Sequence, residues 1–420
     1  MKLPDMARVE QRFDPDHVQD IPAAVKRELS GIGIKNKIRP GQRVAITAGS
    51  RGIDNIAPVT RSVVNFVKEA GGEPFIFPAM GSHGGATDDG QTALLAGYGI
   101  TASSMGCEIR STMEVNEIGR NLDGLPVYLD RCAGEAEHII VINRIKPHTK
   151  FEGPIESGLM KMMAIGMGKH AGAKLYHQAT VRYGMNRVIE TVGLVMMEKA
   201  PLLCGLGLVE NGYDRTAIVR AALPPNLVET EKELLKEARR RMARIPFADI
   251  DLLIVDEIGK NISGTGMDTN VTGVNRDILG TFSAEPRTKR LFVRDLTPET
   301  EGNALGIGFA DFTTTRLVEK IDRKTTYINC LTGISPEKGA IPIYFDTDRE
   351  CIESAIRCLG MISVPDIRVV HIRNTLALSK ISVSKAYLTE IQNSDTLDLA
   401  SGWVPMAFNS GGNLISPFTD

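Results

Sequence analysis

The chain has 420 residues, of which 42% are hydrophobic and 24% are charged, and its formal net charge is −2. This length exceeds what one ordinary hydrophobic core organises, so two domains are expected. The small net charge, with both signs interspersed, argues against a nucleic-acid-binding protein. The N-terminus lacks the apolar core of a secretory signal, and no apolar run is long enough to span a membrane. We therefore expect a cytoplasmic protein whose six scattered cysteines are free thiols.

The first half of the chain alternates short apolar runs with glycine-rich turns. Residues 43–48 form a β-rich run, residues 57–70 carry apolar positions at helical spacing, and residues 73–79 form another β-rich run. A strand–helix–strand order is typical of a parallel sheet. Residues 138–142 (HIIVI) form a third apolar run, which leads into the sequence Lys-Pro-His148. These runs predict three strands of one sheet.

The second half repeats the same alternation. A charged helix is expected over residues 227–244 and a new strand over residues 251–256. We place the boundary between them, which gives an N-terminal catalytic and cofactor domain of residues 1–247 and a C-terminal α/β domain of residues 248–420. Whether the last residues pack back on the first domain is left open. Three further strands are expected, at 290–294, 326–329 and 367–372. The predicted fold class is α/β, with two domains of parallel-sheet character and an active-site cleft between them.

Three polar residues follow the ends of expected strands: Arg51, His83 and His148. In parallel sheets the loops beyond the carboxyl ends of the strands hold the ligand, so one cleft could collect all three side chains. His83 lies between glycines, which let a ligand approach the backbone closely. An acid or base role is one interpretation of such a histidine, and a solvated turn residue is the other.

The stretch from His148 to His177 contains three of the seven histidines. Within it, Lys161 lies among leucine and methionine residues, where burial of an ammonium group would be costly. A desolvated lysine is a candidate nucleophile or cofactor tether, whereas a solvated position on a helix is the alternative. His170 and His177 are seven residues apart and match no zinc signature. The sequence Gly-Met-Gly-Lys-His does not have the spacing of a phosphate-binding P-loop.

On these residues the chain resembles the nickel-dependent lactate racemase family, whose members are two-domain α/β proteins of about this length. The resemblance implies that Ser50 and Arg51 bind the substrate carboxylate, and that His83 and His148 are opposed acid and base groups. Lys260 lies in a glycine-rich loop of the second domain. We expect it to contact the substrate, and an ordinary interdomain loop is the alternative.

The resemblance also implies a cofactor, the nickel-pincer nucleotide (pyridinium-3,5-bisthiocarboxylic acid mononucleotide nickel). In the family, a lysine after a Ser-Gly-Gly-like turn tethers this group; Ser157, Gly158 and Lys161 stand in the corresponding place. His177 stands where the family has a nickel ligand. The gap between His148 and Lys161 is longer than in the lactate enzymes. The loop sequences also differ from those of the lactate enzymes, which indicates a divergent member that acts on another 2-hydroxy acid.

The expected activity is that of an isomerase, a racemase or epimerase of a 2-hydroxy acid. One histidine would take the hydroxyl proton while the C2 hydride passes to the cofactor, and the other would return a proton on the opposite face. The implied partners are the small-molecule acid and the enzymes that synthesise the cofactor, with no nucleic acid and no membrane. Two alternatives stay open: a cofactor-independent lyase or hydrolase that uses the same histidines, and a non-catalytic protein that binds small acids.

Overall fold

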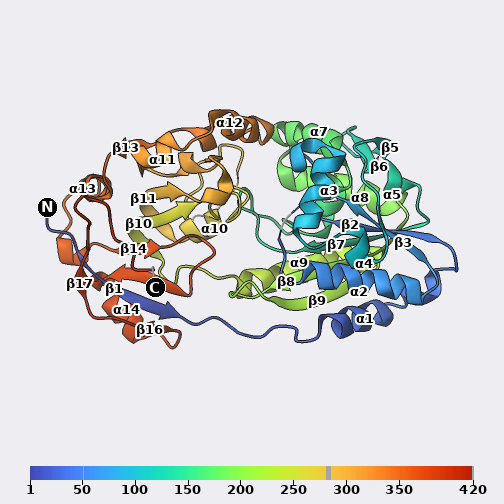
Figure 1. The fold of residues 1–420 in the computed structure, drawn as a ribbon, viewed down its shortest axis with the longest axis horizontal. Coiled ribbons are helices and arrows are strands. Elements are labelled where there is room, and N and C mark those ends of the chain that lie inside the picture. The colour runs from blue at the N-terminus through green and yellow to red at the C-terminus, as the bar shows by residue number, and fades with distance from the viewer. Residues whose placement is uncertain (51, 281–284, 419–420) are drawn as a thin grey trace. The chain divides into compact units, whose positions relative to one another are not determined.

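The computed structural model describes residues 1–50, 52–280 and 285–418, and the chain divides into two units (Figure 1). Pro15–Met242 form one, here called the N-terminal unit. Met1–Asp14 and Ala243–Asp420 form the other, the C-terminal unit. The sequence analysis had placed residues 1–247 together. The first residues belong elsewhere because the strand they form is hydrogen-bonded into the sheet of the C-terminal unit.

The N-terminal unit is built on a six-stranded sheet in the order β4-β3-β2-β7-β8-β9. Its strands are β2 (Arg43–Ala48), β3 (Glu73–Pro78), β4 (Glu108–Ile109), β7 (His138–Arg144), β8 (Leu202–Glu210) and β9 (Thr216–Ala222). All neighbours pair in parallel except β8 and β9, which are antiparallel. A separate antiparallel ribbon joins β5 (Val115–Arg120) and β6 (Pro126–Asp130).

Both faces of this sheet are buried, as parallel sheets require. Successive residues of one strand point to opposite faces, and they enter different apolar clusters. On β7, for example, Ile139 and Val141 belong to one cluster, and Ile140 and Ile142 to the other. The result is a three-layer arrangement in which helices cover each face.

The helices of the N-terminal unit come from nearly every connection between its strands. They are α1 (Ile21–Gly31), η1 (Ile34–Lys37), α2 (Ile56–Glu69), η2 (Gly84–Ala86), α3 (Asp88–Gly97), α4 (Ala102–Met105), α5 (Arg131–Gly134), α6 (Leu159–Lys161), the π-helical turn η3 (Met162–Gly166), α7 (Lys169–Tyr183), α8 (Met185–Lys199) and α9 (Pro224–Arg241). Buried residues of α1 and α2 cover one face of the sheet, and those of α6 to α9 cover the other.

The C-terminal unit contains a nine-stranded mixed sheet in the order β13-β12-β11-β10-β14-β15-β1-β16, with β17 also paired to β1. Its strands are β1 (Asp5–Gln11), β10 (Asp249–Ile258), β11 (Arg287–Leu296), β12 (Phe312–Thr314), β13 (Ile343–Phe345), β14 (Val369–Ile372), β15 (Lys380–Ser384), β16 (Leu397–Leu399) and β17 (Val404–Pro405). The five strands from β13 to β14 are parallel, and the remaining pairs are antiparallel.

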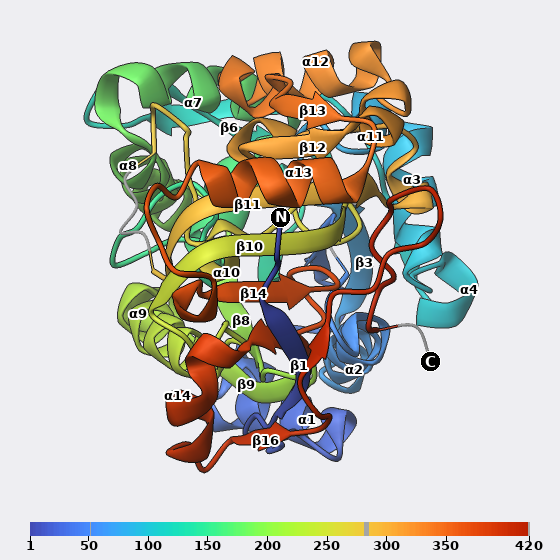
Figure 2. The same cartoon turned by 90° about the vertical axis from the view of Figure 1, so that its left-hand side faces the viewer.

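Short helices connect these strands, and α13 lies across β11 and β12 (Figure 2). The helices are α10 (Thr269–Thr272), η4 (Pro298–Thr300), η5 (Ile307–Phe309), α11 (Thr315–Glu319), α12 (Arg323–Thr332), η6 (Pro336–Gly339), α13 (Asp348–Arg357), η7 (Val364–Asp366), η8 (Lys385–Tyr387) and α14 (Leu388–Gln392).

The prediction of a strand at residues 326–329 is wrong, because these residues lie inside α12. The side chain of Asp322 caps this helix by accepting a hydrogen bond from the backbone N–H of Thr325 at 2.6 Å. Thr326 and Cys330, four residues apart, form its buried side. A cap and a helical spacing of buried residues therefore outweigh the local β-propensity of the run.

The predicted α/β fold class with two units of parallel-sheet character is confirmed. The six cysteines are free thiols, as expected. Within the described part of the chain, none of the helices combines the length and the apolar character needed to cross a membrane.

Candidate active site

The carboxyl ends of β3, β2 and β7 meet at one edge of the sheet of the N-terminal unit, in that order. The loops that leave this edge carry His83, Ser50 and His148, respectively. Because β2 lies between β3 and β7, the loops of the two histidines flank the loop of Ser50. Arg51, the expected neighbour of Ser50 in the site, lies outside the described residues.

The loop after β2 packs against the turn that follows Lys161. A Cβ atom at Gly49 would lie 2.9 Å from Cε of Met162, so a side chain there would require a shift. The carbonyl of Ser50 accepts a hydrogen bond from the hydroxyl of Tyr98 at 3.1 Å. The expected carboxylate-binding loop and the expected cofactor lysine are thus carried by contacting segments.

His83 is half-buried and immediately precedes the turn η2. Its loop contacts α7, because a Cβ atom at Gly81 would lie 2.6 Å from Cβ of Ala173. His177 is on the same helix, one turn beyond Ala173. The loop of an expected acid/base histidine therefore rests on the helix of the expected nickel ligand.

A buried lysine that the sequence analysis did not select lies next to this loop. Lys169, at the start of α7, is fully buried. Its ammonium group donates hydrogen bonds to the carbonyl of Pro78 at 2.6 Å and to Oε1 of Gln91 at 2.5 Å, and it lies 3.8 Å from Oδ2 of Asp130. Burial raises the pKa of Asp130 to about 6, against the opposing effect of a hydrogen bond from Ala133 and the charge of Lys169. Burial also lowers the pKa of Lys169.

Gln91, on α3, connects this lysine to the loop of His83. Its amide nitrogen donates to the carbonyls of Met80 and Gly81 at 3.1 Å each, and to the carbonyl of His83 at 3.3 Å. Like Lys169, Gln91 is fully buried. The backbone on both sides of Ser82 is thus held from inside the protein by one amide group.

The loop of His148 is closed at its base and held from within. Lys146 and Ser157 pair as an isolated antiparallel bridge, with N–O distances of 2.9 and 3.3 Å. Inside the loop, Oε2 of the buried Glu156 accepts the backbone N–H of His148 at 2.5 Å, and Oε1 is bound by the guanidinium of Arg239 on α9. Burial raises the pKa of Glu156, and the hydrogen bonds that it accepts oppose this shift.

The imidazole ring of His148 has a defined orientation. Its Nδ1 accepts the backbone N–H of Lys150 at 3.0 Å, and the ring stacks on Phe151 with a centroid distance of 4.3 Å and an interplanar angle of 25°. When Nδ1 is an acceptor, the proton of the neutral ring is on Nε2. The ring therefore presents Nε2 as the nitrogen that can exchange a proton.

Lys161 ends the short helix α6 and is half-buried. The start of this helix is fixed by Glu231 of α9, whose Oε2 accepts the backbone N–H of Met160 at 2.8 Å. A Cβ atom at Gly158 would collide with Oε1 of the same carboxyl, so a side chain there would force this buried carboxyl to shift. The amide nitrogen of Asn143 donates to the carbonyl of Gly158 at 2.8 Å. Burial raises the pKa of Glu231 to about 7, against hydrogen bonds from backbone N–H groups.

His177 is half-buried on α7, and His170 on the same helix is exposed. The helical run from Leu159 to Tyr183 thus carries both the expected tether, Lys161, and the expected nickel ligand. Among the described residues, no three histidine, cysteine, aspartate or glutamate side chains group as a metal site would require.

Lys260, the expected substrate contact of the second domain, belongs to the C-terminal unit. It follows β10 and is half-buried. Its ammonium group donates to the carbonyl of Gly264 at 2.8 Å, within the same glycine-rich loop. The loop after β10 is therefore folded back on itself around this lysine.

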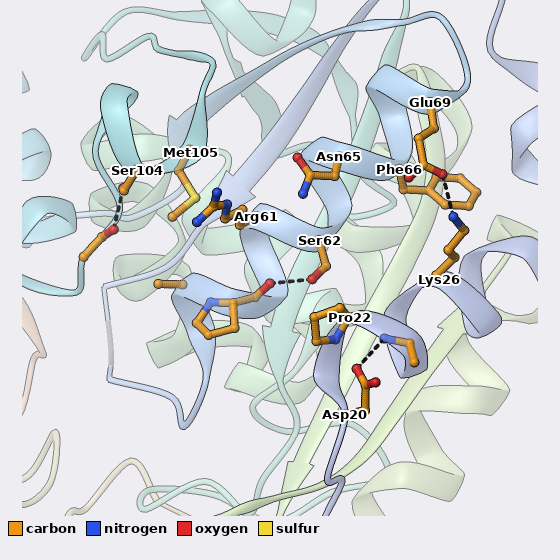
Figure 3. Close-up of a pocket in the computed structure, with 14 residues that line it drawn as sticks. Asp20, Pro22, Lys26, Arg61, Ser62, Asn65, Phe66, Glu69, Ser104 and Met105 are labelled. Atoms are coloured by element: carbon orange, nitrogen blue, oxygen red, sulfur yellow. Dashed lines mark hydrogen bonds and ion pairs between the residues drawn. The ribbon is translucent and has the colours of Figure 1, made fainter.

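A hollow of about 700 Å³ lies elsewhere in the N-terminal unit, along α1, α2 and α4 (Figure 3). Lys26 and Glu69 form an ion pair of 2.8 Å at its side. None of the expected site residues that the structure describes lines it. We assign the candidate active site by the convergence of the three strand-end loops and not by this hollow.

An α/β protein with two loop histidines and a lysine at the carboxyl edge of a parallel sheet has the features of an enzyme that acts on a small ligand. Residues 6–187 match the family model described as the lactate racemase N-terminal domain. The N-terminal part of the chain is therefore similar to the lactate racemase N-terminal domain, in agreement with the family resemblance seen in the sequence. No curated protein matches the chain.

Two solved structures are similar to the chain. A crystal structure of a protein from Thermotoga maritima has a TM-score of 0.52 and 14% sequence identity, covering 83% of this chain and 92% of that one. This likeness supports the fold. The lactate racemase apoprotein from Thermoanaerobacterium thermosaccharolyticum has a TM-score of 0.47 and 15% identity, covering 69% of this chain and 74% of that one.

Proposed function

We propose that the protein is a racemase or epimerase of a 2-hydroxy acid that works with a nickel-pincer nucleotide. The observation that carries the proposal is the strand order β3-β2-β7. It puts the loops of His83 and His148 on opposite sides of the loop of Ser50. Racemisation requires a proton-transfer group on each face of the substrate, and a ligand held over the end of β2 would have one histidine on each side.

The residues present fit the cofactor. Lys161 offers an amine and His177 an imidazole on one helical run, and Gly158, in the turn before Lys161, has no side chain. Imidazole is a suitable ligand for nickel. In the proposal, Lys161 tethers the cofactor, Ser157 and Gly158 contact it, and His177 coordinates the nickel. When bound, the cofactor would supply a reversible acceptor for the C2 hydride.

The remaining roles fall to the chain itself. Ser50 and Arg51 bind the carboxylate and keep C2 in place, because a guanidinium can hold both carboxylate oxygens. Lys260 is proposed as a further substrate contact. His83 and His148 each exchange a proton with the hydroxyl oxygen on their own side. For His148 that nitrogen is Nε2; when it accepts a proton as a base, Nδ1 must carry the other one, and the hydrogen bond from Lys150 is lost.

The test is production of the full chain together with the enzymes that synthesise the cofactor, followed by chiral chromatography of a panel of 2-hydroxy acids. We expect interconversion of the enantiomers of at least one acid. His83→Ala and His148→Ala should each abolish it, whereas His170→Ala, an exposed histidine on α7, should not. Intact-mass analysis should show the cofactor mass on Lys161.

Two results would overturn this assignment. Full racemisation by the His83→Ala/His148→Ala double variant would remove both histidines from the mechanism. Activity of protein made without the cofactor-synthesis enzymes would instead favour a cofactor-independent lyase or hydrolase.

A further inference from the structure

The buried amine of Lys169 does not face solvent and is not part of the mechanism above. It donates directly to the carbonyl of Pro78, the last residue of β3, from which the loop of His83 leaves, and it contacts the loop itself through the side chain of Gln91. Its backbone has a φ of 54°, in the left-handed region that residues other than glycine rarely adopt. The lysine thus occupies its position in spite of both burial and an unfavourable backbone conformation.

The lysine also determines which way the amide of Gln91 points. An ammonium group has only hydrogen-bond donors, so it requires the amide oxygen to face it. The amide nitrogen must then point to the opposite side, where the carbonyls of Met80, Gly81 and His83 converge on it. Two N–H groups serve three acceptors there, so the contacts are partly shared.

Filling this space with a charged and polar network is less favourable in free energy than filling it with apolar side chains. Burial of a charged amine is unfavourable before any compensation, and an apolar side chain of similar volume would pack the same region at lower cost. An apolar side chain could not, however, fix the directions of the inward-facing carbonyls of the loop. The network is therefore suited to fixing the position of the backbone that carries His83.

We propose that Lys169 and Gln91 are positioning residues, which hold the loop of His83 in register with α7, the helix that carries His177. The inference rests on the proposed function, in which His83 is an acid/base group whose position matters. Neither residue is proposed to touch the substrate. The network fixes one histidine relative to the helix of the proposed nickel ligand, so that both face the same ligand position.

The first test is Gln91→Glu in the full chain, followed by hydrogen–deuterium exchange measured by mass spectrometry. Glutamate keeps the size of the side chain and its contact with Lys169, but it cannot donate to the three carbonyls. We expect amide exchange in residues 79–87 to become at least tenfold faster, with the exchange of β2 near the wild-type rate. Gln178→Glu makes the same chemical change at an exposed position of α7 and should leave the loop unaffected.

The second measurement separates positioning from a purely structural role. In protein loaded with cofactor, Gln91→Glu should lower kcat at least tenfold, while KM and the cofactor mass on Lys161 stay as in the wild type. Unchanged exchange in residues 79–87, or a wild-type kcat despite faster exchange, would overturn the inference. If the wild-type protein itself racemises no acid, the proposed function fails, and the exchange result still decides whether the network holds the loop.

Lys169→Met provides an independent variant with a matched control. It should give the same fast exchange of residues 79–87, whereas Lys174→Met, which removes an exposed lysine of the same helix, should not. Slow, wild-type-like exchange in a folded Lys169→Met protein would contradict the inference. If this variant does not fold, the Gln91→Glu result is decisive alone.

Discussion

The loops of His83 and His148 leave the same sheet edge, on either side of β2, but they are held by opposite chemistry. The loop of His83 turns its carbonyls inward, to an amide and an amine that come from α3 and α7. The loop of His148 turns backbone N–H groups inward, to the carboxylate of Glu156 within the loop itself. One loop is fixed by buried donors and the other by a buried acceptor.

This difference determines how each loop can fail. The loop of His148 is held by Glu156, a residue of the loop itself, so its shape depends on a short stretch of sequence and on contacts from Arg239 and Asn186 outside it. The loop of His83 is held by Gln91, eight residues further along the chain, and by Lys169, which is distant in sequence. We therefore expect a change at Glu156 to be felt locally and strongly, and a change at Gln91 to loosen the loop while leaving the rest of the unit intact.

The largest expected effect on stability comes from Glu156→Ala. It leaves the inward-facing N–H groups of His148 and Gly153 without their acceptor and breaks the contact with Arg239. Removal of one partner from a buried charge pair costs about 3–5 kcal/mol, and we expect a loss of about 3 kcal/mol because Arg239 is partly exposed. Urea unfolding at pH 7.5 measures it.

The matched control for this change is Glu233→Ala, which removes an exposed carboxylate of α9. It should change the free energy of unfolding by less than about 0.5 kcal/mol. Hydrogen exchange of residues 79–87 should stay at the wild-type rate in Glu156→Ala. Faster exchange there would show that the two loops are not fastened independently.

Much of this arrangement could be predicted from the sequence, because it follows from local patterns. The apolar runs at residues 43–48, 73–79 and 138–142 are strands of one parallel sheet, so their following loops meet at one edge. The spacing of apolar residues and the positions where the runs end are enough to predict these strands. The same local pattern misleads at residues 326–329, where helix capping outweighs β-propensity.

The buried side chains that hold these segments could not all be predicted, because the roles of Lys169 and Glu231 depend on contacts between residues far apart in the chain. Glu231 belongs to a helix rich in charged residues and reads as one more solvated carboxylate, although its carboxyl group is buried against residues 158–160. Lys169 follows a Gly-Met-Gly turn that the sequence analysis considered only as a phosphate loop. The pairing of the first residues with the last strands is another such contact.

The next effect is a pH dependence of stability that Glu231 confers. Its pKa rises from 4.5 to about 7 in the folded protein because of burial. Between these values the folded state retains a proton that the unfolded state has lost, so stability falls as the pH rises from about 4.5 to 7, by about 3 kcal/mol in total. Glu231→Gln keeps an oxygen for the N–H of Met160 and removes the titration.

We therefore expect urea unfolding of Glu231→Gln to lose this fall, so that the variant is more stable than the wild type at pH 8 and closer to it at pH 5. Glu233→Gln, an exposed neighbour on α9, should retain the wild-type pH profile. A Glu231→Gln profile parallel to that of the wild type would mean that Glu231 does not titrate in this range.

The smallest expected effect tests whether the loop of His148 and the segment of Lys161 form one body. The side chain of Asn143, at the end of β7, donates to the carbonyl of Gly158. Asn143→Ala removes a single hydrogen bond between neutral groups and should cost about 1 kcal/mol of unfolding free energy. If His148 and Lys161 are coupled through this contact, amide exchange should accelerate at residues 157–161 and also within the loop of His148.

Asn186 donates to the carbonyl of Glu152 in the same loop, so Asn186→Ala is a control that loosens the loop without touching Gly158. Faster exchange of residues 157–161 in both variants would show that the coupling runs through the loop itself, whereas a response confined to Asn143→Ala would assign it to the end of β7.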